Sequence, residues 1–188
     1  MVANSLDIRS ETVILRPAQV KDRRAIYEWL ALSDIASFMN GQPNFPDKPV
    51  PTWEEFQVGY VESYFDDSTP LSGRCFLILV EGAPAGQINY NEIKQFAGRK
   101  RTELDIWMRS SQFCGKGYGV DALVMLCGFL SDRFGVQDFM VQPSARNPLA
   151  IRAYEKAGFS KLDINDVQKW ESWGSRDYDD SIIMIKRL

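Results

Sequence analysis

Three glycines at alternating positions, Gly115, Gly117 and Gly119, stand immediately before a run of apolar residues with helical spacing. A loop that leads into a helix leaves the first backbone N–H groups of that helix unpaired, and these groups together with the helix dipole attract an anion. Glycines let the backbone approach a phosphate closely, and Lys116 adds a positive charge. The stretch from Gly115 to Gly119, which includes Tyr118, therefore predicts a phosphate-binding loop. The alternative is a connection in which the glycines only turn the chain.

The same loop satisfies the pattern G-x-G-x-x-A over residues 117–122, which also occurs in dinucleotide-binding proteins. That fingerprint should directly follow the first strand of a β-α-β unit, and an acidic residue should close the next strand. The acid at a suitable distance, Asp138, instead begins the next predicted strand. The dinucleotide interpretation is therefore poor, and the Walker pattern GxxxxGK[ST] is absent from the sequence.

The sequence contains no histidine. This absence excludes Ser-His-Asp and Cys-His catalysis, and it makes a zinc or iron site improbable. Acid-base chemistry must therefore be carried out by carboxylates, tyrosine, lysine, cysteine or water, and no metal is expected.

A second segment, residues 147–159, reads Asn-Pro-Leu-Ala-Ile-Arg-Ala-Tyr-Glu-Lys-Ala-Gly-Phe. It is similar to the signature N-x-x-A-x-x-x-Y-E-K-x-G-F of GNAT acetyltransferases, and the glycine loop resembles their pyrophosphate motif R/Q-x-x-G-x-G/A. The resemblance covers nearly the whole chain, and it implies acetyl-CoA as co-substrate and N-acetyl transfer to a primary amine as the activity. The first Arg or Gln of the family motif is Cys114 here, so one usual side-chain support of the loop is missing, whereas the backbone donors that dominate such a site remain.

Within the superfamily, three stretches look like the aminoglycoside 6'-N-acetyltransferases and the related siderophore and lysine acyltransferases. These stretches are Tyr-Glu-Trp-Leu at 27–30, Leu-Asp-Ile-Trp at 104–107, and the segment from Pro143 to Phe159. The resemblance thus implies a small cationic amine, such as an aminoglycoside, as the acceptor. Two alternatives stay open: acetylation of a protein N-terminus or lysine, and a non-catalytic acyl-CoA-binding module, which the departure at Cys114 would fit.

Acetyl transfer from a thioester to an amine needs a neutral nucleophile, a polarised carbonyl and a proton for the leaving thiolate. Amines such as lysine titrate near ~10.4 and thiols near ~8.5, so the protein must accept a proton early and can donate one late. Asp105, on the strand before the glycine loop, is the candidate that orients the amine and takes its proton. The competing interpretation is an ordinary Asp on the solvent side of a strand.

The resemblance assigns further roles on the coenzyme side. Tyr154 matches the family tyrosine that protonates the thiolate, although its helical spacing also suits core packing. Asn147 is expected to bind the pantetheine arm, or only to cap its helix. Backbone N–H groups near Trp107 and Met108 are expected to polarise the thioester carbonyl.

The acceptor pocket is expected between the two N-terminal helices and the segment that joins the last two strands. Acidic residues and tryptophans are frequent there, a combination that suits a cationic ligand. The candidates that contact the substrate are Trp53, Glu55, Asp105, Trp170 and Trp173. The competing interpretation is a solvated acidic surface.

The elements that must position these residues are visible as hydrophobic periodicity and turn signals. Strands are predicted over 12–16, 74–80, 85–92, 102–108, 139–142 and 180–186. Helices are predicted over 21–32, from the capping box Thr52-x-x-Glu55 to Phe65, from the glycine loop to Phe134, and over 148–157 with Asn147 as N-cap. The predicted fold is α/β (α+β), a mixed and mostly antiparallel sheet of about seven strands flanked by about four helices in a single domain over residues 1–188.

Composition narrows the partners. The formal net charge is -3, with 22 basic and 25 acidic residues, so no nucleic-acid partner is expected. No apolar run is long enough to cross a bilayer, so no membrane span is expected. The N-terminus does not resemble a signal peptide, so a cytoplasmic protein is expected. The protein is expected to be a monomer or a homodimer. The three cysteines form no CxxC pair and are expected to be reduced.

Overall fold

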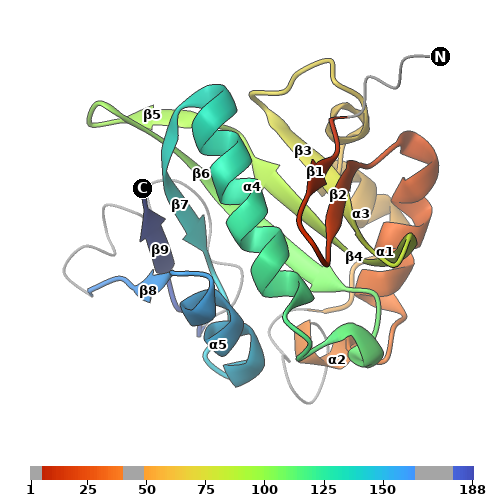
Figure 1. The fold of residues 1–188 in the computed structure, drawn as a ribbon. Coiled ribbons are helices and arrows are strands. Elements are labelled where there is room, and N and C mark those ends of the chain that lie inside the picture. Colours follow the sequence, from red (N-terminus) through yellow and green to blue (C-terminus); the bar gives the residue numbers. More distant parts are fainter. Residues whose placement is uncertain (1–5, 40–48, 164–179) are drawn as a thin grey trace.

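The computed structural model describes residues 6–39, 49–163 and 180–188. Within them, one nine-stranded sheet runs in the order β1-β2-β3-β4-β6-β7-β9-β8, and β5 pairs with β6 (Figure 1). All neighbouring strands are antiparallel except β6 and β7, which are parallel. The strands are β1 (Ile8–Arg9), β2 (Ile14–Pro17), β3 (Gly73–Val80), β4 (Ala83–Asn91), β5 (Lys94–Phe96), β6 (Arg99–Met108), β7 (Val136–Val141), β8 (Ser160–Lys161) and β9 (Met184–Arg187).

Helices pack on both faces of the sheet, which confirms the predicted mixed architecture. On one face the long α4 (Tyr118–Phe134) crosses the strands, and α5 (Pro148–Lys156) lies beside it (Figure 1). On the other face α1 (Arg23–Ala31) and α3 (Trp53–Gly59) pack against β3 and β6, followed by the 3-10 helix η2 (Glu62–Phe65). The remaining helical elements are α2 (Ala36–Met39) and the 3-10 helices η1 (Val20–Asp22) and η3 (Ser111–Phe113).

Two apolar clusters follow from this layering. The larger lies between the sheet and α4, and its fully buried members include Phe76, Leu123 and Phe139. The smaller lies between the sheet and the N-terminal helices, with Phe56 and Trp107 buried in it. Alternation along each strand directs successive side chains to the two clusters, so neighbouring residues of β6 face different helical layers.

The helix predicted from Thr52 to Phe65 is interrupted, which corrects the sequence-based prediction. The capping box at Thr52 and Glu55 is present, but α3 ends at Gly59 and the chain resumes as η2 at Glu62. The spacing of Phe56, Tyr60 and Tyr64 is helical, so the periodicity of aromatic residues conceals the break. The backbone of Tyr60 is no longer helical, with φ -106° and ψ 70°. This change of direction points the ring of Tyr60 toward the sheet.

Other differences lie at strand ends. The predicted turn at residues 96–100 is a tight hairpin in which Ala97 and Gly98 both have positive φ, and it pairs the unpredicted strand β5 with β6. The last strand begins at Met184 instead of residue 180; Ser181 makes only an isolated bridge to Ser144. The short elements β1 and α2 were also not predicted, because two to four residues carry too little periodic pattern.

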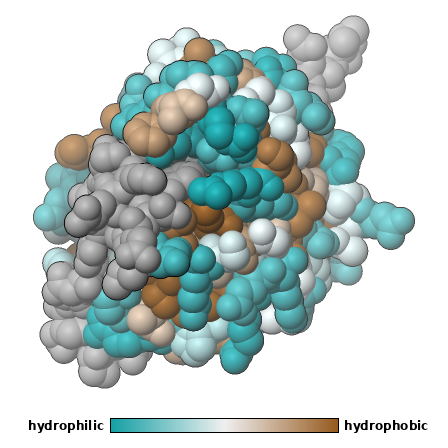
Figure 2. Space-filling model, turned by 90° about the vertical axis from the view of Figure 1, so that its left-hand side faces the viewer, coloured by the Kyte–Doolittle hydropathy of each residue, from teal (hydrophilic) through white to brown (hydrophobic). Residues whose placement is uncertain are grey.

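Hydrophilic residues cover much of the face shown in Figure 2, and hydrophobic residues lie between them nearer its centre. No helix in the described part of the chain is long and apolar enough to span a membrane. Among the same described residues, no three or more His, Cys, Asp or Glu side chains are grouped so that they could hold a metal ion.

Candidate active site

Strands β6 and β7 pair only over the first part of β6. The last pair in their register is Glu103 with Met140, whereas β6 continues to Met108. On its other edge β6 stays paired with β4, and the N–H of Arg109 donates to the carbonyl of Ala85 at 2.8 Å. Because N–H groups alternate along a strand, the N–H of Met108 points to the edge that β7 has left. The parting of the two strands thus exposes a polar backbone edge next to Asp105.

A cavity of about 320 Å³ opens beside this edge. Asp105, Ile106 and Trp107 of β6 line one side, and Asn147 and Tyr154 line the other side from the start and the body of α5. Helix α3 contributes Glu55, Phe56 and Gly59. Both residues assigned acid-base roles therefore meet in one cavity, although they come from elements far apart in the sequence.

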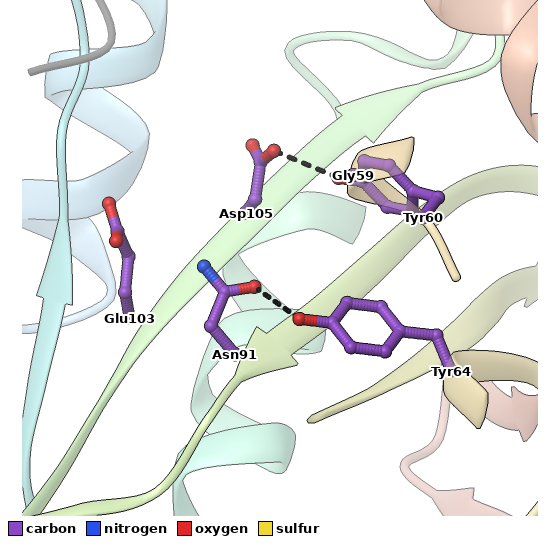
Figure 3. Close-up of a pocket in the computed structure, with 6 residues that line it drawn as sticks. All are labelled: Gly59, Tyr60, Tyr64, Asn91, Glu103 and Asp105. Carbon is purple, nitrogen blue, oxygen red and sulfur yellow. Dashed lines mark hydrogen bonds between the residues drawn. The ribbon is translucent and has the colours of Figure 1, made fainter. Parts of the chain in front are cut away.

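Asp105 is held by the phenol of Tyr60, whose hydroxyl lies 3.1 Å from Asp105 Oδ2 and 45 residues away in the sequence. A second cavity, of about 230 Å³, is lined by Gly59, Tyr60, Tyr64, Asn91, Glu103 and Asp105 (Figure 3). Asp105 is common to both cavities, so it is not an ordinary Asp on a solvated strand face.

The phenol of Tyr60 keeps its proton at neutral pH. Burial raises its pKa well above the usual value, and the negative charges of Asp105 and of the Cys75 thiolate form act in the same direction. Tyr60 is therefore a hydrogen-bond partner of Asp105 and not a base itself.

Tyr154 packs in the core and also lines the larger cavity. Its side chain is 8% exposed and packs edge-on against Phe159, with ring centroids 6.0 Å apart. It also lines the larger cavity, so burial holds the ring while part of it faces the space beside Asp105. Its role as an acid stays a prediction.

Asn147 caps α5 as predicted. Its Oδ1 accepts the N–H of Ala150 at 3.1 Å, and Pro148 occupies the first helical position. The residue also lines the larger cavity. Because the cap occupies the side-chain oxygen, the Nδ2 group is the part of Asn147 that suits a carbonyl of the pantetheine arm.

The glycine loop has the backbone that an anion site needs. Gly115 and Gly117 have φ of 72° and 90°, a region that L side chains rarely adopt, and Gly117 is the N-cap of α4. The 17-residue helix α4 begins directly after it, and the first N–H of its regular ladder is that of Asp121, which donates to the carbonyl of Gly117 at 3.0 Å. The N–H groups of Tyr118, Gly119 and Val120 precede this bond and lie at the end of the helix where an anion can be bound. Lys116 lies exposed between the two glycines with positive φ.

The start of α4 also lies against the open edge of β6. A Cβ built on Gly119 would be 3.6 Å from Ile106 Cδ1 and 3.9 Å from Met108 Sδ, which is ordinary contact. The start of α4 and Met108 at the open end of β6 are therefore neighbours, as a single extended ligand that reached both would require.

Gly119→Ala is expected to weaken acetyl-CoA binding by about tenfold or more, because its methyl group hinders close approach of a pyrophosphate. The fold should be retained or become slightly more stable, by less than about 1 kcal/mol, since Ala has a higher helix propensity than Gly and Gly119 lies in the first turn of α4. Calorimetric titration and thermal unfolding measure the two effects. The matched control is Gly128→Ala, which lies later in α4 and has open space at its Cβ; it should change stability alone. Equal acetyl-CoA affinity in both variants would contradict the proposed phosphate site.

The remaining predicted residues are placed as follows. Glu55 lines the larger cavity, but its carboxylate accepts the N–H of Thr52 at 2.8 Å, a bond that also lowers its pKa. The ring of Trp53 packs against the ring of Tyr27. Trp53 is not among the described residues that line either cavity. The indole of Trp107 is buried and donates to the carbonyl of Ile26 at 3.3 Å. Trp170 and Trp173 lie outside the described residues.

Sequence reasoning missed Tyr60 and a row of amides on β4. Gln87, Asn89 and Asn91 point to the same face as Asp105, and the first two are almost fully buried. The alternation of polar and apolar residues from Gln87 to Asn91 was a usable signal, but it normally indicates a solvent-exposed strand face. Their burial shows that this face is instead covered by the N-terminal helices.

The cysteines are free thiols, as predicted. Burial raises the pKa of Cys127 to about 12 and raises that of Cys75 further, while Cys114 is half-buried and has a raised pKa for the same reason. All three therefore stay protonated at neutral pH, which excludes a thiolate nucleophile among them.

Comparison with known proteins agrees with this geometry. Residues 12–160 match the family described as Acetyltransferase (GNAT) domain. The aminoglycoside N(6')-acetyltransferase type 1 of Klebsiella pneumoniae is 29% identical over 171 residues, which cover 86% of this chain and 78% of that protein. Among solved structures, AAC(6')-Ib in complex with paromomycin and acetyl-CoA is similar with a TM-score of 0.67, 23% identity and 94% of each chain covered. The apo structure of RimL, a ribosomal alpha-N-protein acetyltransferase, has a TM-score of 0.71 at 19% identity and covers 98% of this chain and 95% of that one.

Proposed function

This chain belongs to the GNAT acetyltransferase family, and from that premise we propose that it transfers the acetyl group of acetyl-CoA to a primary amine of a small cationic acceptor, with an aminoglycoside as the first candidate. The observation that carries the proposal is the cavity in which Asp105 and Tyr154 face one space beside the parted strands. The family supplies the reaction class, and this cavity supplies an acid and a base for it.

The coenzyme fits the loop and the open strand edge together. The N–H groups at the start of α4 suit the pyrophosphate, Lys116 adds a positive charge, and Asn147 offers an amide to the pantetheine arm. The N–H of Met108 points into the gap between β6 and β7, where it can donate to the thioester carbonyl. The acetyl group would then lie within the cavity that Asp105 shares.

The chemistry is assigned to the chain as follows. Asp105 accepts a proton from the ammonium group of the acceptor, directly or through water, and the free amine attacks the thioester carbonyl. The N–H of Met108 stabilises the negative charge that develops on the carbonyl oxygen. The C–S bond then breaks and Tyr154 donates its proton to the leaving thiolate. The surplus proton on the amide nitrogen restores the phenol of Tyr154, directly or through water, and Asp105 releases the proton it has gained to solvent.

The acceptor is proposed to be cationic because carboxylates and aromatic rings surround the reacting position. Glu103 and Asp105 both line the smaller cavity together with the phenols of Tyr60 and Tyr64 (Figure 3). Carboxylates attract an ammonium group, and the rings offer their negative faces to it. The 6'-N-acetyltransferase relative with 29% identity supports an aminoglycoside as the first amine to test.

Acetyl-CoA is expected to stabilise the folded chain, because a ligand that binds only the native state shifts unfolding by mass action. At a concentration one hundred times its Kd the gain is about 2.7 kcal/mol, which thermal unfolding detects. NADH serves as the control for a dinucleotide site and should give no shift. Equal shifts with both ligands would contradict the coenzyme assignment.

The acceptor is tested by thiol release from acetyl-CoA with aminoglycosides, polyamines and N-terminal peptides side by side. Turnover with a cationic small molecule and none with peptides supports the proposal. Turnover with peptides alone would replace it with protein acetylation, and binding of acetyl-CoA without turnover on any amine would contradict the proposed transfer.

A further inference from the structure

The hydroxyl of Tyr60 lies between two oxygen atoms at equal distances. It is 3.1 Å from Oδ2 of Asp105 on β6 and 3.1 Å from Oδ1 of Asn89 on β4. A phenol carries one proton, so it can donate to only one of these oxygens at a time, while its own oxygen can accept from a donor. The protonation state of Asp105 therefore decides in which direction the phenol donates.

The amide row on β4 determines that Asn89 presents an oxygen to Tyr60. The thiol of Cys75, which burial keeps protonated, donates to Gln87 Oε1 at 3.0 Å. Gln87 Nε2 must then donate to Asn89 Oδ1 at 3.3 Å, and Asn89 Nδ2 donates to Asn91 Oδ1 at 3.1 Å. Each group orients the next one, so Asn89 Oδ1 is an acceptor at the position next to the phenol.

The ring of Tyr60 is held in place by its neighbours. It stacks on Phe56 with centroids 4.5 Å apart and contacts Tyr64 and Trp107 edge-on at 6.1 and 5.5 Å. The backbone break after α3 directs the ring into this position. The O–H bond can rotate while the ring stays fixed, so only the proton has to move between the two acceptors.

We propose that Tyr60 is a positioning residue for Asp105 that pairs with its carboxyl group in both protonation states during acetyl transfer. When Asp105 is ionised, the phenol donates its proton to Oδ2. After Asp105 has taken the proton of the amine, the carboxylic acid donates to the phenol oxygen and the phenol proton turns to Asn89 Oδ1. No bond within Tyr60 is broken, and the proton gained by Asp105 is the one that the amine has lost.

The arrangement removes a penalty that a buried base would otherwise face. A buried donor or acceptor that is left without a hydrogen-bond partner is destabilised, because it has lost its bonds to water. A fixed donor would satisfy only the ionised form of Asp105, and a fixed acceptor only the protonated form. A hydroxyl backed by an acceptor satisfies both, so Asp105 can cycle between its two forms at little cost.

Other titratable groups face the same space and contribute to the charge around Asp105. From the elements packed around it these are Glu55, Tyr64, Cys75, Glu103 and Tyr154. None of the substitutions below alters these five groups, so the comparison between variants isolates the hydrogen bonds of Tyr60.

The inference rests on the proposed function, but two opposite shifts test it without turnover. Tyr60→Phe removes a strong, charge-assisted hydrogen bond from the ionised form of Asp105 and only a weaker neutral one from the protonated form, so the pKa of Asp105 should rise by about one unit. Asn89→Leu removes the acceptor that the protonated state needs, so the pKa of Asp105 should fall. Titration of carbon-13-labelled aspartate carboxyls by NMR measures both, and Asp105→Asn identifies the resonance.

The matched control is Tyr27→Phe. Tyr27 belongs to the same apolar cluster as Tyr60, but its hydroxyl donates to the carbonyl of Pro51 at 3.2 Å instead of to Asp105. The Tyr27→Phe variant should have a lower melting temperature than the wild type and an unchanged titration of Asp105. With an active acceptor, Tyr60→Phe should also move the acidic limb of kcat to higher pH by the same amount and lower kcat about tenfold, with KM for acetyl-CoA retained.

The outcomes separate the two proposals. If the wild type acetylates no amine, the proposed function fails, while opposite NMR shifts in the two variants would still support the pairing. If the wild type is active and both variants leave the pKa of Asp105 unchanged, or move it in the same direction, the role of Tyr60 is overturned. Should Tyr60→Phe not fold, the direction of the shift in Asn89→Leu decides alone.

Discussion

Asp105→Asn should reduce acetyl transfer by about 10² to 10⁴, the range expected when a positioned base is lost. The amide keeps the shape of the carboxylate, and its oxygen can still accept the hydroxyl of Tyr60, so folding and acetyl-CoA binding should change little. In the wild type, protonation of Asp105 at low pH removes the base, so the rate rises with pH through an acidic limb. That limb should vanish in the variant, which a pH series of kcat and kcat/KM measures.

Glu103→Gln is the control for this prediction, because it makes the same change two residues earlier in β6 and in the same small cavity. It should raise KM for a cationic acceptor and keep the acidic limb, since it removes attraction but no base. If Asp105→Asn showed the same pattern, with normal kcat and raised KM, Asp105 would be a binding residue. Unchanged kinetics in Asp105→Asn would contradict both roles.

Tyr154→Phe is expected to lower the rate of the chemical step by up to about 10² to 10⁴ while acetyl-CoA affinity stays nearly the same. The ring remains, so its packing against Phe159 and its burial are preserved, and only the proton donor to the thiolate is lost. Single-turnover measurement is needed, because slow product release would conceal the change in steady-state kcat.

The control for Tyr154 is Tyr90→Phe, another buried phenol on the α4 side of the sheet. Its hydroxyl donates to the carbonyl of Pro70 at 2.7 Å, outside both cavities. Its loss should cost about 1 kcal/mol of stability and no chemical rate. If the single-turnover rate of Tyr154→Phe were that of the wild type, Tyr154 would be a core residue whose hydroxyl takes no part in the reaction.

Features that depend on residues close together in the sequence were predicted from it. The capping box at Thr52 and Glu55 and the cap at Asn147 each involve a side chain and a backbone group three residues apart. The start of α4 after the glycine loop and its end at Phe134 follow from the glycines that stand before and after the apolar run. Such features can be predicted from sequence because each depends only on the geometry of residues that are close together in the chain.

The family motifs belong to the same class. The loop and the segment from Asn147 to Phe159 each form a contiguous stretch, so the coenzyme side of the site and the reaction class were predicted from sequence, and membership of the family is confirmed by the match over residues 12–160. Asp105 was also named, but its competing interpretation as a solvated strand residue could not be removed until its surroundings were known.

Only the tertiary structure decided what surrounds Asp105. Tyr60 comes from a helix break that the aromatic periodicity concealed, and Asn89 comes from an alternating strand that seemed exposed by its pattern. The parting of β6 and β7 after Glu103 depends on how two strands separated by the whole of α4 pair, which no periodicity encodes. The alternation of residues in each strand predicts which side chains lie on the same face of the sheet. Which residues of other elements contact that face depends on long-range packing. The sequence therefore determined the glycine loop before α4 and the family, and the packing of distant elements determined the environment of Asp105.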